Sequence, residues 1–219
     1  MHDVYQFVSG PLAWAAFGLF VGGSLYRIAA MILLARRKDV QVFEYMSLRY
    51  ALRSILHWSV PFMSVNMRQR PVMTVVTFLF HLCLILSPLF VLGHVVMFDT
   101  SFGFSWPALP DQLADAMTLV VVAACLFFLG RRLSLAEAQY VTSFSDYAIL
   151  ALVAAPFITG FLAYHQFLDY QLMLVLHIVS GEAMLVAIPF TRLSHMLFAP
   201  FTRAYIGSEF GAVRHARDW

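Results

Sequence analysis

Five long apolar stretches constrain the fold of this chain more than any other feature. About 20 apolar residues are needed to cross about 30 Å of hydrocarbon as an α-helix, and stretches of this kind lie near residues 9–35, 71–98, 113–131, 144–165 and 169–198. They are continuous rather than alternating, which favours helices over a β-barrel. Because only 12% of the 219 residues are charged, we predict an all-α integral membrane bundle of five spans. We expect a single membrane domain over residues 1–219.

A further apolar segment, near residues 42–60, has the pattern of a helix that lies in the membrane interface. Arg49, Arg53 and His57 recur every four residues along one side. The apolar residues fall on another side: Leu48, Leu52, Ile55 and Leu56. We therefore expect an amphipathic interfacial helix between the first two spans, ending near Pro61.

The basic residues predict the orientation in the membrane. They lie between spans one and two, after span three and in the tail 199–219: Arg36, Arg37, Lys38, Arg49, Arg53, Arg68, Arg70, Arg131, Arg132, Arg203, Arg214 and Arg217. The opposite connections carry acids: Asp99, Asp111, Asp115 and Asp169. The positive-inside rule then places the N-terminus outside and the C-terminus in the cytoplasm.

Four histidines lie inside the apolar stretches, His81 and His94 on the second and His177 and His195 on the fifth. An imidazole in hydrocarbon is a functional candidate, because it is costly there unless something binds it. The separation of His177 from His195 corresponds to five turns of one helix, so both should share a face, about 27 Å apart. His81 and His94 are about 20 Å apart along an ideal helix but roughly 140° around it. We therefore predict a distortion near Ser87-Pro88.

Matching the expected depths pairs His81 with His195 on the cytoplasmic side and His94 with His177 on the outer side. Two such pairs predict bis-imidazole ligation of two haem b groups, with the four histidines as axial ligands of iron. The two cysteines are not in a C-x-x-C-H sequence, which excludes covalent c-type haem attachment. Histidines that only pack against neighbouring polar groups are the alternative; a metal ion held by side chains is less favoured.

Two arginines lie within the spans, Arg27 and Arg192. Each is costly in the membrane without a partner, and a haem propionate could pair with a guanidinium through two hydrogen bonds. Arg192 is one turn from His195 and is the first candidate for the cytoplasmic-side haem. Snorkelling to the interface is the alternative, above all for Arg27.

Two residues follow His177 on the same span. Gly181, one turn further, could let a flat macrocycle approach the backbone, or could serve ordinary helix packing. Glu182 is an acid well inside the span. It could accept a proton at a quinone site, or be a buried structural acid, and the sequence leaves both readings open.

Several motifs resemble the cytochrome b (gamma) subunit of respiratory nitrate reductases, over nearly all of spans two to five: Phe80-His81, Gly93-His94, Arg131-Arg132-Leu133, Leu176-His177 and the stretch from Pro189 to His195. The connection 36–70, the stretch 155–161 and Ser87-Pro88 look more like a second branch, the cytochrome b subunits of the transmembrane redox complexes of sulfate-reducing bacteria. The resemblance implies five spans in a bacterial cytoplasmic (inner) membrane, a periplasmic N-terminus, and two haems b on His81, His94, His177 and His195.

By this resemblance the chain would be an electron-transfer subunit that is not catalytic alone. Its expected partners are a periplasmic multihaem cytochrome c, a cytoplasmic iron–sulfur subunit, other membrane subunits and the lipid bilayer, with no nucleic acid. One alternative is a quinol-oxidising or quinone-reducing subunit that binds menaquinone near the outer haem, with Glu182 or His165 handling protons. Another is a haem-free membrane anchor.

Overall fold

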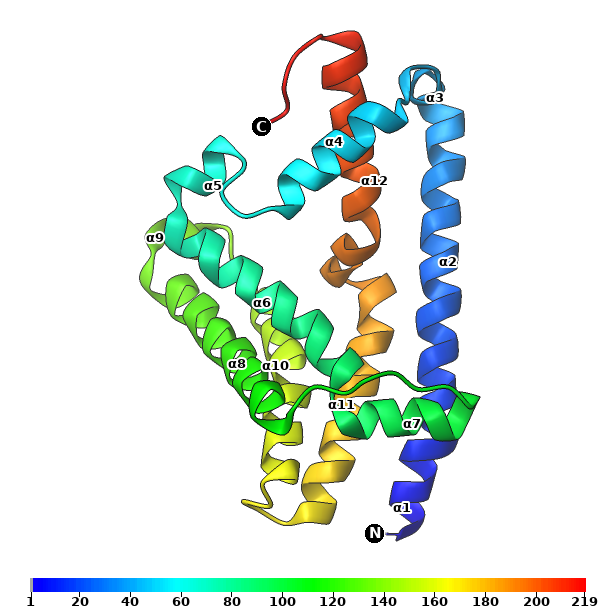
Figure 1. The fold of residues 1–219 in the computed structure, drawn as a ribbon, viewed down its shortest axis with the longest axis vertical. Coiled ribbons are helices and arrows are strands. Elements are labelled where there is room, and N and C mark those ends of the chain that lie inside the picture. Colours follow the sequence, from blue (N-terminus) through cyan, green and yellow to red (C-terminus); the bar gives the residue numbers. More distant parts are fainter. Residues whose placement is uncertain (1) are drawn as a thin grey trace. The chain divides into compact units, whose positions relative to one another are not determined.

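The computed structural model describes residues 2–219, and every regular element in this range is a helix (Figure 1). In chain order the elements are α1 (His2–Phe7), a π-helical turn (Val8–Leu12), α2 (Ala13–Lys38), α3 (Gln41–Tyr45), α4 (Leu48–Ser59), α5 (Val65–Gln69), α6 (Pro71–Phe90), α7 (Leu92–Phe102), α8 (Asp111–Ser134), α9 (Ala136–Tyr140), α10 (Phe144–Tyr164), α11 (Tyr170–Phe190), a 3₁₀ turn (Arg192–Ser194), α12 (His195–Ser208) and a second π-helical turn (Glu209–Val213).

Five helical stretches are long and apolar enough to cross a membrane: His2–Lys38, Pro71–Phe90, Asp111–Ser134, Phe144–Tyr164 and Tyr170–Phe190. Most of their side chains are not buried by protein, as expected for helices whose apolar surface faces lipid. The predicted all-α, five-span class is confirmed, and the chain is a multi-pass membrane protein.

The described chain divides into two compact units. The first holds residues 2–9 and Val76–Gly181, and the second holds Gly10–Val75 and Glu182–Trp219. Helices α6 and α11 each run from one unit into the other. The expected single domain over 1–219 stays a prediction.

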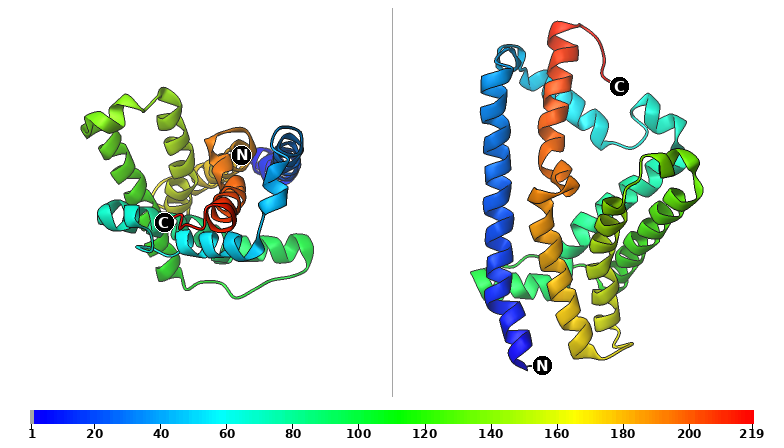
Figure 2. Two further views of the ribbon diagram at one scale, coloured as in Figure 1. Left: turned by 90° about the horizontal axis from the view of Figure 1, so that it is seen from above. Right: turned by 180° about the vertical axis from the view of Figure 1, so that it is seen from behind.

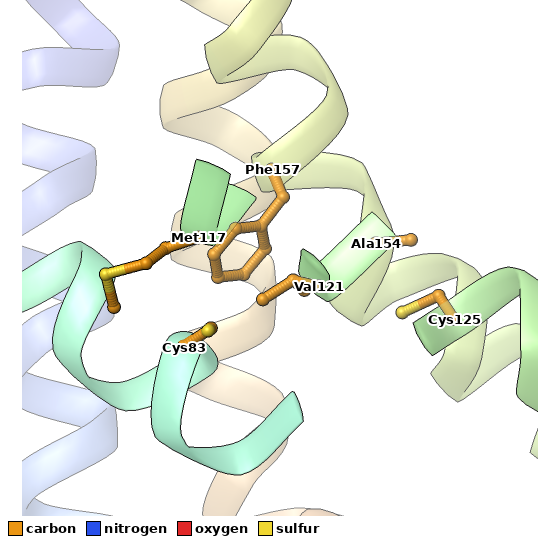
Figure 3. Close-up of a cluster of buried hydrophobic side chains, with 6 residues drawn as sticks. All are labelled: Cys83, Met117, Val121, Cys125, Ala154 and Phe157. Atoms are coloured by element: carbon orange, nitrogen blue, oxygen red, sulfur yellow. The ribbon is translucent and has the colours of Figure 1, made fainter. Parts of the chain in front are cut away.

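The core of the first unit lies between α6, α8 and α10. Its buried side chains are Cys83, Met117, Val121, Cys125, Ala154 and Phe157. Figure 3 shows the ring of Phe157 directed toward Val121 and Cys83. Both cysteines are free and buried, so they pack as small apolar residues, as expected for thiols in such surroundings.

The second predicted span is broken. Helix α6 ends at Phe90, Val91 is extended (φ −65°, ψ 134°), and α7 begins at Leu92. Figure 1 shows α7 bending away from the direction of α6. The predicted distortion after Ser87-Pro88 is therefore confirmed, but the expectation of one span over 71–98 is wrong: the part long enough to span ends at Phe90.

Specific donors satisfy the carbonyls at the end of α6. The last carbonyls of a helix have no partner within it, and here each accepts a hydrogen bond: Ser87 from the backbone N–H of Val91 (2.9 Å), Pro88 from Nδ1 of His94 (2.7 Å), Leu89 from Nε1 of Trp106 (2.8 Å) and Phe90 from the backbone N–H of Leu109 (2.8 Å). The break therefore leaves no unpaired carbonyl among these four, and it uses one of them to hold an imidazole.

The fifth predicted span is broken as well. Helix α11 ends at Phe190. Thr191 is extended (φ −124°, ψ −170°), and α12 begins at His195 after a 3₁₀ turn. The expectation of one span over 169–198 is wrong, and so is the argument that His177 and His195 share one face of one helix.

Proline and threonine account for this break. Pro189 has no N–H to continue the helical hydrogen bonds of α11. The hydroxyl of Thr191 donates to the carbonyl of Ala187 (2.7 Å) and accepts from the backbone N–H of Leu193 (3.2 Å). The threonine therefore closes one helix and caps the next turn.

In the second unit, α4 crosses α12 at very short range. A Cβ built on Gly207 would lie 2.6 Å from the carbonyl oxygen of Tyr50 and would also overlap the Cβ of Ser54. Ala51 and Ser54 are buried on this side of α4. Only glycine permits so close an approach of two backbones.

The predicted interfacial helix is two helices, α3 and α4, separated by an extended Met46 and Ser47. The apolar side of α4 is open in the described structure: Leu48 is 74%, Leu52 47% and Leu56 64% exposed. An exposed leucine row opposite a protein contact is the pattern of a helix at a membrane surface. The predicted tail 199–219 is helical through Ser208 and continues into the π-helical turn.

Candidate functional site

Two of the predicted ligands lie close together in the first unit, with nearly parallel ring planes. His94 is on the first turn of α7 and His177 is on α11. Their ring centres are 5.8 Å apart, and the ring planes are inclined by 16°. Residues 83 positions apart in the chain are thus brought together, in the pairing expected from the sequence.

This spacing can be compared with that of two imidazoles on opposite sides of one metal. Two metal–nitrogen bonds of about 2 Å, with the distance from each nitrogen to its ring centre, place the ring centres about 6 Å apart. The separation of His94 and His177 is 5.8 Å. Among the described residues no group of three or more His, Cys, Asp or Glu side chains is gathered at ligand distance. A metal here would need further ligands from a group such as a porphyrin.

All four predicted ligands use the same ring nitrogen to bind backbone. The contacts are His81 Nδ1 to the carbonyl of Thr77 (2.8 Å), His94 Nδ1 to Pro88 (2.7 Å), His177 Nδ1 to Pro156 (2.8 Å) and His195 Nδ1 to Arg192 (2.9 Å). A carbonyl oxygen only accepts hydrogen bonds, so Nδ1 carries the proton in each ring.

The consequence is that, in the neutral form of each ring, the lone pair lies on Nε2. This is the arrangement found in metal-ligating histidines, where a backbone carbonyl fixes the tautomer and the ring orientation. Other histidines are held differently, since His2, His57 and His165 make polar contacts through Nε2. The shared Nδ1 contact therefore separates the four candidates from these three.

Gly160 on α10 makes room for the ring of His177. A Cβ built at this position would lie 2.8 Å from Nδ1 and 2.9 Å from Cε1 of that ring. Pro156, whose carbonyl accepts the His177 proton, lies one turn earlier on the same helix. Sequence reasoning assigned no role to either residue. A glycine one turn after a proline inside an apolar span was the signal that could have drawn attention to them.

The other two predicted ligands belong to different units. His81 lies on α6 in the first unit, edge-on to the ring of Phe80 (ring centres 5.1 Å apart). His195 is the first residue of α12 in the second unit. Their pairing stays a prediction.

The arginine candidates lie near His195 in the chain or in space. The Arg27 guanidinium lies over the ring of Phe198, 5.3 Å from its centre, and Phe198 is one turn after His195 on α12. Arg192 supplies the carbonyl that accepts the His195 proton. Arg192 is thus adjacent to His195 in the chain, and Arg27 contacts a residue one turn further along α12.

Gly181 and Glu182 have contrasting surroundings. A Cβ built at Gly181 meets no atom of the described residues within 4 Å, so close helix packing at this glycine is not observed there. Glu182 is 9% exposed, and neither carboxylate oxygen has a hydrogen-bond partner among the described residues. A buried carboxyl without a partner is uncommon and marks a functional candidate in a span.

These features define a class: a multi-pass helical membrane protein with two facing imidazoles held by backbone carbonyls. No protein-family model matches the chain. It is 40% identical over 215 residues to a protein of Nitratidesulfovibrio vulgaris strain Hildenborough, in a match that covers 96% of this chain and 95% of the other. The chain belongs to the family of that protein.

Proposed function

We propose that this protein is a di-haem b subunit that moves electrons across a bacterial cytoplasmic membrane. Its four axial ligands would be His94 with His177 and His81 with His195. In this proposal the chain is one part of a respiratory redox complex and is not an enzyme by itself.

The single observation that carries the proposal is the pair of facing imidazoles with protonated Nδ1 atoms. The rings of His94 and His177 are 5.8 Å apart and nearly parallel. Each donates to a proline carbonyl, so both have Nε2 available as a ligand atom. Gly160, which leaves room for the His177 ring beside the Pro156 carbonyl, supports the same assignment.

The chain's own residues would hold and orient the group. Pro88 and Pro156 fix the two outer rings, Gly160 lets one of them approach α10, and Arg27 and Arg192 are the candidates for pairing with propionates. A bis-imidazole haem supplies one-electron transfer with no open axial position for a substrate.

The charges suggest where partners would bind. The acids Asp99, Asp111, Asp115 and Asp169 suit a basic periplasmic cytochrome c, and the basic connections suit an acidic cytoplasmic iron–sulfur subunit. Complementary charges of this kind steer encounter more than they add affinity. The proposed orientation, with a periplasmic N-terminus, follows the positive-inside rule.

A second candidate function is favoured by one cavity in the first unit. A pocket of about 290 Å³ is lined by His2, Tyr5, Tyr170, Gln171, Leu174 and Val175. Its polar rings and apolar walls suit a quinone such as menaquinone, and Leu174 lies one turn from His177. Titration with a menaquinol analogue tests this: unchanged haem absorbance would remove the quinone site.

A reduced-minus-oxidised spectrum of the purified protein tests the main proposal. A b-type band is expected, together with two haems per chain by the pyridine haemochrome assay. A protein that folds in the membrane fraction and carries no haem would be a membrane anchor, and the proposal would fail.

A further inference from the structure

The segment Ala216–Trp219, called the tail segment below, folds back onto α4. Figures 1 and 2 show the chain after α12 turning back alongside that helix, toward α4. Helix α4, α12 and the tail segment all belong to the second unit. The tail segment therefore lies against α4 beside its contact with α12.

A carboxylate of the tail segment reaches a buried hydroxyl of α4. The Ser54 hydroxyl donates to Oδ2 of Asp218 at 2.5 Å, and Ser54 is 0% exposed. A hydrogen bond to an ionised acceptor is stronger than one between neutral groups. This contact anchors the tail segment beside the α4–α12 crossing.

An aromatic ring of the tail segment lies between two basic side chains of α4. The Trp219 ring centre is 4.8 Å from the Arg53 guanidinium carbon and 4.0 Å from the centre of the His57 ring, on which it stacks. Arg53 also lies over the ring of Tyr50, 4.7 Å from its centre, and donates to the carbonyl of Ala216 (3.4 Å). The basic side of α4 is thus covered by one carboxylate and one aromatic ring.

The fit is incomplete. Three buried polar atoms at this contact have no hydrogen-bond partner among the described residues: Nε of Arg53, Nε1 of Trp58 and Oδ1 of Asp218. Leaving buried donors and acceptors unpaired lowers the stability of a contact. A ligand that accepted hydrogen bonds from Arg53 Nε and Trp58 Nε1 would compete with the tail segment.

We propose that this basic side of α4 is a docking face for a partner protein, and that the tail segment is its internal competitor. The partner would present an acidic side chain next to an aromatic ring, as Asp218 and Trp219 do. The face consists of Arg53, Ser54, His57 and Trp58. This inference does not depend on haem binding.

The geometry of α4 favours a protein partner over lipid at this face. Arg53 follows Leu52, and successive residues are about 100° apart around a helix. The exposed row Leu48, Leu52 and Leu56 is the apolar side that suits a membrane. The docking face is therefore a separate side from the leucine row; it is polar and carries the Arg53 guanidinium, and its present occupant is a peptide segment.

The test uses the full chain in phosphatidylcholine nanodiscs and a labelled peptide with the sequence of residues 214–219. The double variant Asp218→Ala/Trp219→Ala should bind the peptide at least tenfold more tightly than wild type, because a tethered competitor acts at an effective concentration near the millimolar range. Adding Arg53→Gln should reverse the gain. The matched control Arg49→Gln, one turn earlier on α4, should leave it unchanged.

Circular dichroism and a monodisperse elution profile establish that each variant folds. If the double variant does not fold, the single variant Trp219→Ala takes its place in the binding experiment. A peptide carrying Asp218→Asn should bind at least fivefold more weakly. Equal peptide affinity in wild type and in the folded variants would overturn the proposal. So would loss of peptide binding when the nanodiscs contain phosphatidylglycerol, because the face would then bind anionic lipid.

Discussion

Two places in this molecule depend on a glycine, and they use it for different ends. In the first unit, Gly160 faces the imidazole of His177, with 2.8 Å from a built Cβ to Nδ1. In the second unit, Gly207 faces the backbone of α4, with 2.6 Å from a built Cβ to the carbonyl oxygen of Tyr50. Gly160 leaves room for the imidazole ring of His177, and Gly207 leaves room for the backbone of α4.

The polar groups at the two places differ in the same way. At the first place, proline carbonyls accept hydrogen bonds from the Nδ1–H groups of two imidazoles, so that in each neutral ring the lone pair lies on Nε2. At the second, serine hydroxyls bind backbone and the tail segment; Ser208, for example, accepts from the backbone N–H of Ser47 at 3.1 Å. Hydrogen bonds prepare a ligand atom in one place and hold helices together in the other.

The sharpest test of this difference is removal of an imidazole. His94→Ala and His177→Ala should each reduce the haem content from two to one per chain, because the remaining imidazole cannot hold the iron from both sides. Pyridine haemochrome quantitation measures the loss. Retention of both haems in either folded variant would contradict the ligand assignment.

The next largest effect is expected at Gly160. Gly160→Ala should push the His177 ring from its place and break its hydrogen bond to Pro156. Loss of such a supporting contact costs about 10–100-fold in metal affinity, which haem titration of the apoprotein measures. Gly130→Ala is the matched control, because a Cβ there meets nothing within 4 Å. Equal haem affinity in the Gly160→Ala and Gly130→Ala variants would show that Gly160 does not support haem binding.

At the helix crossing the expected effect is on stability alone. Gly207→Val should destabilise the protein by about 1–3 kcal/mol, the usual cost of overpacking, and lower its Tm in detergent. Haem content per folded chain should stay at two. A fall in haem content without a fall in Tm would show that the two places are not separate in function.

The smallest effect concerns the connection between spans one and two. Burial, a hydrogen bond with Tyr205 and nearby negative charge raise the pKa of Tyr45 above its ordinary value of 10.0. The stabilising contribution of the protonated phenol is complete below about pH 10 and is lost as pH rises through the raised value. Tyr45→Phe should therefore flatten the decline of Tm above pH 10. If Tm declines equally in the Tyr45→Phe variant and in wild type, other titrating groups cause the decline.

Element type was predictable from the sequence, whereas two helix ends were not. Five apolar runs were enough for five spanning helices, since a chain in lipid must satisfy its backbone internally. The break at Val91 interrupts a run that stays apolar on both sides, whereas the break at Thr191 is followed by the polar Arg192, Ser194 and His195. Proline marked each region, but proline can also be tolerated inside a helix, as Pro156 is in α10. Which outcome occurs depends on donors supplied from elsewhere, such as Trp106 to the carbonyl of Leu89.

The sequence by itself determined the membrane class, the number of spans and the histidines worth following, because hydropathy and buried imidazoles are local properties of the chain. Only the tertiary structure decided that His94 and His177 face each other, that proline carbonyls hold their Nδ1 protons, and that His195 starts a new helix. Those facts depend on where distant carbonyls, glycines and rings meet in space. No spacing along one helix contains that information.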